Sequence, residues 1–342
     1  MGGAWRRAAW AGGVLAALAA AYLAIGGVLT ARVLTRVLTV PPASALLAGA
    51  PPTDPFALGY RGDPKAAFGY DFQTVDIPGE LGPAPAWLVP GAGGAKGEVW
   101  AVYVHGIAGL RENGYRHLSV LHAAGLPTLL ISYRNDPGAP ASPSGEYQFG
   151  LSEWRDLDAA VAYAEANGAE RIVLVAESMG GGIAGQFLAR SPRAAKVSAL
   201  VLDAPALDFP AVVESLLSAR GLPFSGTLAR GGMWLRTARG GFDGNDAVTL
   251  PIIRDFRGPL FVAHGGGDTI VPVSISDRLA TQRHGATTYL RSQADHLASW
   301  QEDPALYRAQ LRAFLALAVT SPSPARAGLL DGAPSPSQEA HK

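Results

Sequence analysis

Short apolar runs alternate with amphipathic stretches through most of the chain. The runs have the length of strands buried on both faces of a sheet, and they lie at residues 99–104, 127–133, 172–176, 199–202, 259–263 and 287–290. Apolar side chains recur at helical spacing at residues 115–124, 153–166 and 304–319. This alternation predicts an α/β fold with a doubly wound, mostly parallel sheet. Two earlier stretches, 72–77 and 86–89, predict antiparallel edge strands that lead into it.

The N-terminus carries a different pattern. From Ala8 to Ala31 there are 24 residues without a charge, between Arg6-Arg7 and Arg32. As a helix this stretch would be about 36 Å long, enough to cross the hydrocarbon core of a bilayer. We therefore predict one transmembrane helix and a single-pass membrane anchor within residues 1–36.

Two other interpretations of this stretch are open. A cleaved signal peptide would have a shorter apolar region followed soon by a small-residue site, whereas the candidate sites at 43–45 and 48–50 lie well downstream. A buried helix of a soluble domain is the other alternative. For an anchor, the positive charges favour the N-terminus inside and the main domain on the extracytoplasmic side, by a margin of one charge.

Composition divides the rest of the chain. Residues 37–70 are rich in Pro, Ala and Gly and predict a linker with little regular structure. Residues 71–320 hold the predicted sheet and its helices. Within them, 206–255 is too long for a simple crossover, so we predict a cap over the active site, with a surface excursion as the alternative. It has one amphipathic stretch, 211–219, and Gly-rich polar pieces, and the tail at 321–342 predicts disorder.

Charge and cysteine content exclude several kinds of chemistry. The formal net charge of the 342-residue chain is zero, so nothing in its charge argues for a nucleic-acid partner. The chain has no cysteine, which excludes disulfides, thiolate metal sites and cysteine nucleophiles.

A serine follows the apolar run at 172–176 and precedes three glycines. A buried strand that turns sharply into a helix projects a serine at the turn, as in the nucleophile elbow G-x-S-x-G. Here the elbow would read Ala176-Glu177-Ser178-Met179-Gly180, with alanine in place of the first glycine. The pattern predicts Ser178 as a nucleophile.

A serine hydroxyl needs a base, and the base needs an acid to orient it. Of the seven histidines, His296 lies in a polar loop after the last predicted strand, where the base is expected in the order Ser, Asp, His. His105 and His264 stand beside glycines at strand ends, where we expect them to pack loops. His117 and His122 lie in a predicted helix, and we expect both at the surface.

Two aspartates compete for the role of the acid. Asp268 follows three glycines directly after the strand at 259–263, on the loop expected to face the elbow. Asp203 ends the preceding strand and is the rival. Asp295 adjoins His296 in sequence, but neighbouring residues on an extended loop point apart, so we expect Asp295 at the surface.

Acyl transfer also needs two backbone N–H groups directed at the developing oxyanion. One is expected from Met179, the residue after the nucleophile. The other is expected from Ile107, in the loop that begins His105-Gly106.

Taken together, these motifs resemble the α/β-hydrolase family. The resemblance covers residues 70 to 320 and rests on the elbow, the His-Gly loop, the Gly-Asp-x-x-Val-Pro run at 267–272 and the late Asp-His pair. Within the family, the chain is similar to serine hydrolases grouped with serine aminopeptidases and acylaminoacyl peptidases. The resemblance implies Ser178 as nucleophile, Asp268 as acid and His296 as base, and the departure is Ala176.

These observations predict a membrane-anchored serine hydrolase that forms an acyl-enzyme intermediate on an ester or lipid-like acyl substrate, with no cofactor or metal. A peptidase acting on short peptides is one alternative, although it would need carboxylates for the substrate amine, and the predicted cap offers only Asp208 and Glu214. A non-catalytic binding module that keeps the fold is another alternative.

Overall fold

The computed structural model describes residues 2–41, 45, 47–94 and 97–320. The tail at 321–342, which the sequence predicts to be disordered, lies outside the described residues.

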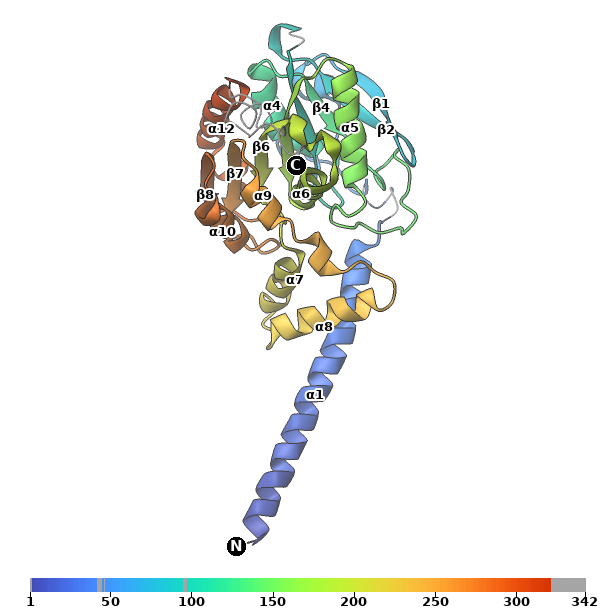
Figure 1. The fold of residues 1–342 in the computed structure, drawn as a ribbon, viewed down its shortest axis with the longest axis vertical. Coiled ribbons are helices and arrows are strands. Elements are labelled where there is room, and N and C mark those ends of the chain that lie inside the picture. Colours follow the sequence, from blue (N-terminus) through green and yellow to red (C-terminus); the bar gives the residue numbers. More distant parts are fainter. Residues whose placement is uncertain (1, 42–44, 46, 95–96, 321–342) are drawn as a thin grey trace, which may run out of the picture.

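A single eight-stranded sheet forms the centre of the molecule (Figure 1). Its spatial order is β1-β2-β4-β3-β5-β6-β7-β8. β2 pairs antiparallel with β1 and β4, and all other neighbours are parallel, which confirms the predicted mostly parallel sheet and its antiparallel edge. The strands are β1 (Gln73–Gly79), β2 (Gly82–Val89), β3 (Val99–Val104), β4 (Thr128–Ile131), β5 (Arg171–Glu177), β6 (Val197–Asp203), β7 (Leu260–Gly265) and β8 (Thr287–Ser292).

Helices cover both faces of the sheet, so each face has its own hydrophobic core. Alternate strand residues point to opposite faces: Leu174 of β5 packs in the core under α5 and α6, whereas Val173 and Val175 pack in the core under α4 and α12. The domain also contains α10, α11 and three short 3₁₀ helices, labelled η1, η2 and η3. The bounds of all these helices are α4 (Tyr115–Ala123), α5 (Trp154–Ala166), α6 (Met179–Arg190), α12 (Pro304–Thr320), η1 (Ala92–Gly94), η2 (Arg111–Gly114), η3 (Pro192–Lys196), α10 (Ser274–Gln282) and α11 (Ser299–Glu302).

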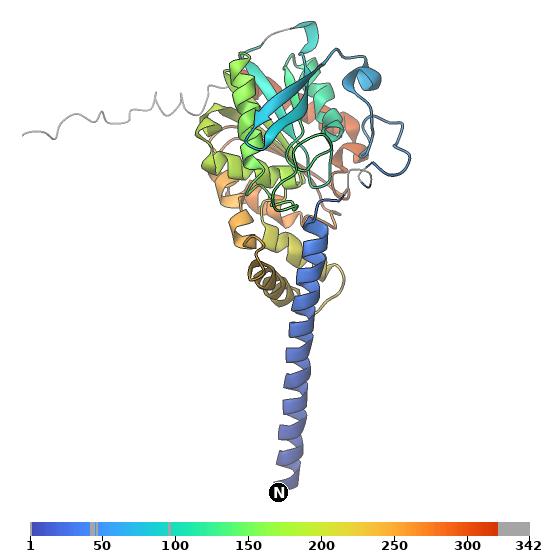
Figure 2. The same ribbon diagram turned by 90° about the vertical axis from the view of Figure 1, so that its right-hand side faces the viewer.

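The N-terminal stretch forms one long helix, α1 (Gly2–Leu38). Figures 1 and 2 show its N-terminal half projecting away from the rest of the molecule. From Trp5 to Leu38 it is long and apolar enough to cross a membrane. Its C-terminal end differs, because Leu34 and Leu38 are buried in the core of the α/β domain.

The insertion between β6 and β7 contains more helix than the sequence analysis predicted. Besides α7 (Phe209–Ser218), which matches the amphipathic stretch, it forms α8 (Ser225–Thr237), η4 (Gly244–Ala247) and α9 (Leu250–Asp255). The prediction missed α8 because glycine is unfavourable inside helices. Tertiary packing requires it here: a Cβ at Gly232 would lie 2.5 Å from the Thr30 side chain of α1.

The predicted linker is also more ordered than its composition suggested. It contains the short helix α3 (Pro64–Phe68), which Asp63 caps by accepting a hydrogen bond from the Ala66 N–H. Its aromatic side chains pack on the α/β domain, for example Phe56 on Trp300 with ring centroids 5.1 Å apart. Aromatic burial therefore outweighs the low helical and strand propensity of this segment.

Candidate active site

Ser178 occupies a sharp turn between β5 and α6. Its φ is 49° and its ψ is −120°, a conformation that non-glycine residues rarely adopt and that is typical of functional sites. The turn is held by its own backbone: the Ser178 N–H donates to the Asp203 carbonyl, and the Ser178 carbonyl accepts from the Gly181 and Ala206 N–H groups, all at 2.9–3.0 Å.

Close backbone approach explains the glycines around this turn. A Cβ at Gly180 would lie 2.4 Å from the Val104 carbonyl oxygen, and one at Gly106 would lie 2.9 Å from the Ser178 Cβ. Ala176, which replaces the first glycine of the elbow pattern, is fully buried in β5. It pairs with Val104 and Leu202 on the neighbouring strands, so this turn accommodates its methyl group.

Three predicted site residues meet at the turn. The Ser178 Oγ lies 3.0 Å from His296 Nε2, and His296 Nδ1 lies 2.7 Å from Asp268 Oδ2. Because Nδ1 faces a carboxylate, it carries the proton and Nε2 is left to accept from the serine hydroxyl. This is the hydrogen-bond order of a serine, a base and an orienting acid.

The Asp268 carboxylate has four hydrogen-bond partners. Its Oδ1 accepts from the Ile270 and Val271 N–H groups at 2.8 Å, and its Oδ2 lies 3.2 Å from His264 Nε2 as well as close to His296. Burial by itself raises the pKa of Asp268, but the hydrogen bonds from His264 and His296 outweigh it and hold the pKa well below its usual range. The sequence analysis assigned His264 only to loop packing and missed this contact.

The two other aspartates point elsewhere. Asp203 is buried beneath the elbow, where its Oδ2 accepts from the Tyr307 hydroxyl at 3.0 Å. Asp295 is exposed, as predicted, and its carboxylate accepts from the Thr269 N–H and hydroxyl. Neither contacts the His296 ring among the described hydrogen bonds, so only Asp268 is placed to orient it.

The residues predicted to bind the oxyanion flank Ser178. Met179 is the first residue of α6, where backbone N–H groups have no partner within the helix. Ile107 lines the same pocket as Ser178. Beside Ile107, the His105 ring faces two acceptors, the Gly106 carbonyl at 2.9 Å and Asp136 Oδ2 at 2.8 Å. Burial alone lowers the pKa of His105, but the Asp136 carboxylate raises it above its ordinary value. The hydrogen bond between these two buried side chains holds the loop in place.

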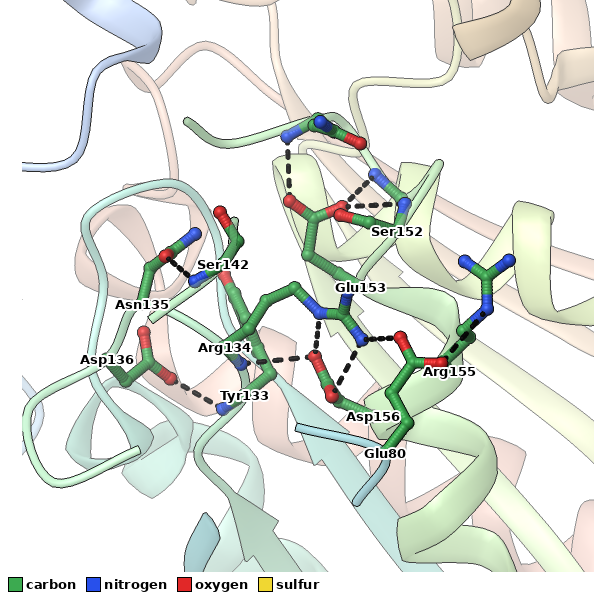
Figure 3. A network of polar contacts seen from close by, with 12 residues as sticks. Glu80, Tyr133, Arg134, Asn135, Asp136, Ser142, Ser152, Glu153, Arg155 and Asp156 are labelled. Carbon is green, nitrogen blue, oxygen red and sulfur yellow. Dashed lines mark hydrogen bonds and ion pairs between the residues drawn. The ribbon is translucent and has the colours of Figure 1, made fainter. Parts of the chain in front are cut away.

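A polar network holds the long loop after β4, which contains Asp136. Figure 3 shows the Arg134 guanidinium between Asp156 of α5 and Glu80 of the β1–β2 turn, and Glu153 accepting from backbone N–H groups of the same loop. Arg134 is buried and Asp156 is only 10% exposed, which strengthens the ion pair between them, whereas Glu80 faces solvent. The loop is thereby attached to α5 and to the edge of the sheet.

A second buried network, which the sequence analysis missed, lies beneath the elbow. Arg116 pairs with Glu177, the residue before Ser178, and its Nη1 donates to the Leu297 carbonyl at 2.8 Å. The Tyr103 hydroxyl donates to the same carboxylate. The prediction that His117 lies at the surface was wrong: it is 1% exposed and its Nε2 lies 2.9 Å from the Tyr307 hydroxyl. His122 is half-buried and stacks on Tyr70.

His117, Glu177 and Asp203 bring ligand atoms within 4.8 Å of one another. A metal ion there would have to share this space with the Arg116 guanidinium, which already pairs with Glu177. We therefore interpret the group as an ion-pair and hydrogen-bond network.

The pocket at Ser178 has a volume of about 370 Å³. Its walls come from the loops at 106–113, 270 and 296–297 and from residues 58–61 of the predicted linker. None of its lining residues comes from the insertion at 206–255, and a cap over the active site stays a prediction. The insertion instead packs against α1 through α8.

Comparisons with known proteins agree with this fold. A model of the alpha/beta hydrolase fold family matches residues 101–228. Two uncharacterized proteins from Mycobacterium tuberculosis strains are each 30% identical over 201 residues, which is 56% of this chain and 60% of each relative.

Solved structures share the fold at low identity. An esterase from Pyrococcus furiosus matches with a TM-score of 0.58 and 18% identity, over 78% of this chain and 96% of its own. Est1E from Butyrivibrio proteoclasticus, with ferulic acid bound, matches with a TM-score of 0.55 and 17% identity, over 72% of this chain and 100% of its own. The chain is therefore an α/β-hydrolase-fold protein, as its motifs indicated.

Proposed function

We propose that this protein is a serine hydrolase that cleaves an ester or lipid-like acyl substrate. The observation that carries the proposal is the hydrogen-bonded order of Ser178, His296 and Asp268 at a strained elbow. This order supports the proposal, because a serine nucleophile needs a base beside its hydroxyl and an acid that orients the base.

The reaction follows from the positions of the protons. His296 Nε2 takes the hydroxyl proton as the Ser178 Oγ attacks the acyl carbon, and Asp268 stabilises the imidazolium that forms. The N–H groups of Met179 and Ile107 bind the oxyanion. His296 then gives its proton to the leaving alkoxide, which departs as the alcohol and leaves the acyl group on Ser178. Water, deprotonated by His296, attacks this ester, and the acid is released as Ser178 recovers its proton.

The lining of the pocket favours esters over peptides with a free amine. A substrate ammonium would need a carboxylate near the acyl site, and none of the residues that line the Ser178 pocket carries one. Glu214 and Asp208 lie together in another hollow of the insertion, where Asp208 is paired with Arg278. The structural neighbours named as esterases point the same way.

We propose in addition that α1 anchors the protein as a single-pass helix. Trp5, Trp10 and the apolar side chains of its N-terminal half are exposed, which is costly in water and favourable in lipid. The placement of the α/β domain on the extracytoplasmic side stays a prediction from the one-charge margin.

The test is fluorophosphonate labelling of the full-length protein in detergent. We expect one label per chain, at Ser178, because only an activated serine reacts rapidly. Ser178→Ala should abolish labelling, and His296→Ala should reduce its rate by at least about 100-fold. An acyl-ester chain-length series on the same samples would then define the substrate.

Matched controls separate catalysis from folding. Ser218→Ala and His284→Ala change exposed residues of the same types, and both should label like wild type. If the folded wild-type protein were not labelled, or if His296→Ala labelled at the wild-type rate, the hydrolase proposal would fail and the binding-module alternative would stand. Comparable thermal unfolding midpoints would show that all variants are folded.

A further inference from the structure

A groove runs between α1 and α7, away from Ser178. It has a volume of about 390 Å³ and follows α1 from Tyr22 to Val37, a length of about 22 Å. Its walls are aliphatic, and Ile25 and Leu29 on α1 are 60% and 52% exposed. Arg220 is the one charged side chain among its lining residues. It shares no lining residue with the Ser178 pocket.

The length of α1 indicates which end of this groove would lie among the lipid chains. A bilayer core about 30 Å thick needs about 20 helical residues, and because Arg6 and Arg7 exclude an earlier start, the core would run from Ala8 to about residue 27. Tilting the helix only lengthens the stretch required. The Tyr22 hydroxyl, within this stretch, donates to the Pro223 carbonyl at 2.9 Å. The turn between α7 and α8 is therefore held at the depth of the lipid chains.

The composition of this turn suits such a depth. Residues 221–229 carry no charge, and Phe224 and Leu222 are 71% and 37% exposed. Figure 1 shows α8 lying across α1, an orientation that would keep it near the plane of the membrane surface. These exposed apolar side chains would be more favourable in the hydrocarbon of a bilayer than in water.

Arg220 marks where the headgroups would lie. Its guanidinium donates to the Leu216 carbonyl at 2.7 Å, so it points back along α7 toward the α/β domain and the bilayer surface. Long basic side chains at a membrane interface extend in this way to reach phosphates. The stretch from 209 to 240 has four arginines and one glutamate. Arg236 is buried and paired with Glu146, so Arg220, Arg230 and Arg239 are the positive charges that favour anionic lipid.

We propose that the membrane-side end of this groove, next to Tyr22, is a lipid-binding site that holds one acyl chain of an anionic phospholipid, with the lipid phosphate at Arg220. The part of the groove beyond about residue 27 would lie outside the hydrocarbon core. The proposal rests on the membrane anchor proposed above and is independent of catalysis at Ser178. A lipid bound there joins α7 to α1, and so attaches the insertion to the membrane.

The test is photo-crosslinking of the purified full-length protein in phosphatidylcholine–phosphatidylglycerol vesicles. The probe is a phosphatidylglycerol with a diazirine in its acyl chain, and labelled peptides are identified by mass spectrometry. We expect labels on α7 and on the facing part of α1. Leu217→Trp, which fills the groove, should lower labelling of α7 about fivefold, whereas Leu306→Trp on α12 should not change it. Arg220→Gln should reduce labelling by this probe to the level of a phosphatidylcholine probe with the same chain.

Peptides from residues 10–21 serve as the internal reference, because this part of α1 touches bulk lipid in every variant. Labels there without labels on α7 would overturn the lipid site and leave the anchor intact. Labelling of α7 that Leu217→Trp did not reduce would mean bulk contact rather than a groove, and would also overturn it. If residues 10–21 were unlabelled, α1 would not lie in the bilayer, and both proposals would fail.

Discussion

Buried charge next to the candidate nucleophile is balanced by a single arginine. Arg116 is 1% exposed and joins Glu177, on the strand that bears Ser178, to the Leu297 carbonyl, on the loop that bears His296. Such a pair is expensive to bury, and removing one partner leaves an unpaired charge. Its evident consequence here is geometric, because it ties together the two segments whose side chains must meet.

His117, beside this pair, should make stability depend on pH. Burial lowers the pKa of His117 to about 4, against 6.5 for an ordinary histidine. The unfolded chain therefore binds more protons between these values, and the stability that comes from keeping His117 neutral is complete above pH 6.5 and is lost as the pH falls through 4. The difference corresponds to about 3 kcal/mol at most.

Thermal unfolding of the full-length protein at pH 7 and pH 4.5 measures this effect. The midpoint should fall by several degrees more in wild type than in His117→Gln, which keeps a donor for the Tyr307 hydroxyl. His284→Gln, at an exposed position, should fall as wild type does. Equal falls in wild type and His117→Gln would show that His117 is not the group responsible.

At the scale of elements, the crossing of α1 and α8 decides where the insertion lies. Both helices bring glycines to it: Gly27 lies near Gly231, and Gly26 lies against Leu228. Small residues let helix backbones approach closely, which strengthens packing where there is little water to expel. The glycines that prevented the prediction of α8 from sequence therefore allow it to pack closely on α1.

Two neighbouring glycines of α8 should respond in opposite ways to alanine. A Cβ at Gly231 meets only the Gly27 Cα, at 4.0 Å, so Gly231→Ala should be neutral or stabilising by up to about 1 kcal/mol through helix propensity. A Cβ at Gly232 lies 2.5 Å from the Thr30 side chain and 3.1 Å from the Ala31 nitrogen. Gly232→Ala should therefore destabilise by about 1–3 kcal/mol, measured as a lower thermal midpoint. A midpoint for Gly232→Ala at or above that of Gly231→Ala would contradict this packing.

At the scale of the whole molecule, the two ends of α1 differ in their surroundings. Its N-terminal half is exposed, whereas Ala31, Leu34 and Leu38 are buried against the α/β domain. The C-terminal part of the proposed anchor thus also belongs to the fold, and the position where the chain is cut matters for any truncated form.

Two truncations test this dual role. A chain that begins at residue 22 keeps the buried part of α1 and should unfold near the full-length midpoint in the same detergent. A chain that begins at residue 40 loses Leu34 and Leu38, each worth about 1.5–3 kcal/mol of burial, and exposes the face of α8. We expect it to unfold at a clearly lower temperature or to aggregate. Equal midpoints for the two truncations would show that α1 contributes nothing to the stability of the domain.

Local pattern and chain order were enough to predict the sheet, its antiparallel edge and the elbow serine, because strand periodicity and turn chemistry act over a few residues. The order Ser178, Asp268, His296 could likewise be proposed from sequence alone. That Asp268 rather than Asp203 touches the His296 ring, at 2.7 Å, is a contact between distant segments, and only the folded chain decides it.

Tertiary structure also decided the features that composition misrepresented. The glycines of α8 predict a loop from sequence, but in the fold they pack against α1. The sequence likewise predicts His117 at the surface, but Tyr307, 190 residues later, packs against it. The length of the insertion predicts an added substructure, but only the folded chain shows that α8 packs on the N-terminal helix. In each case the physical reason is the same: burial and close contact depend on partners remote in sequence, which local propensity does not contain.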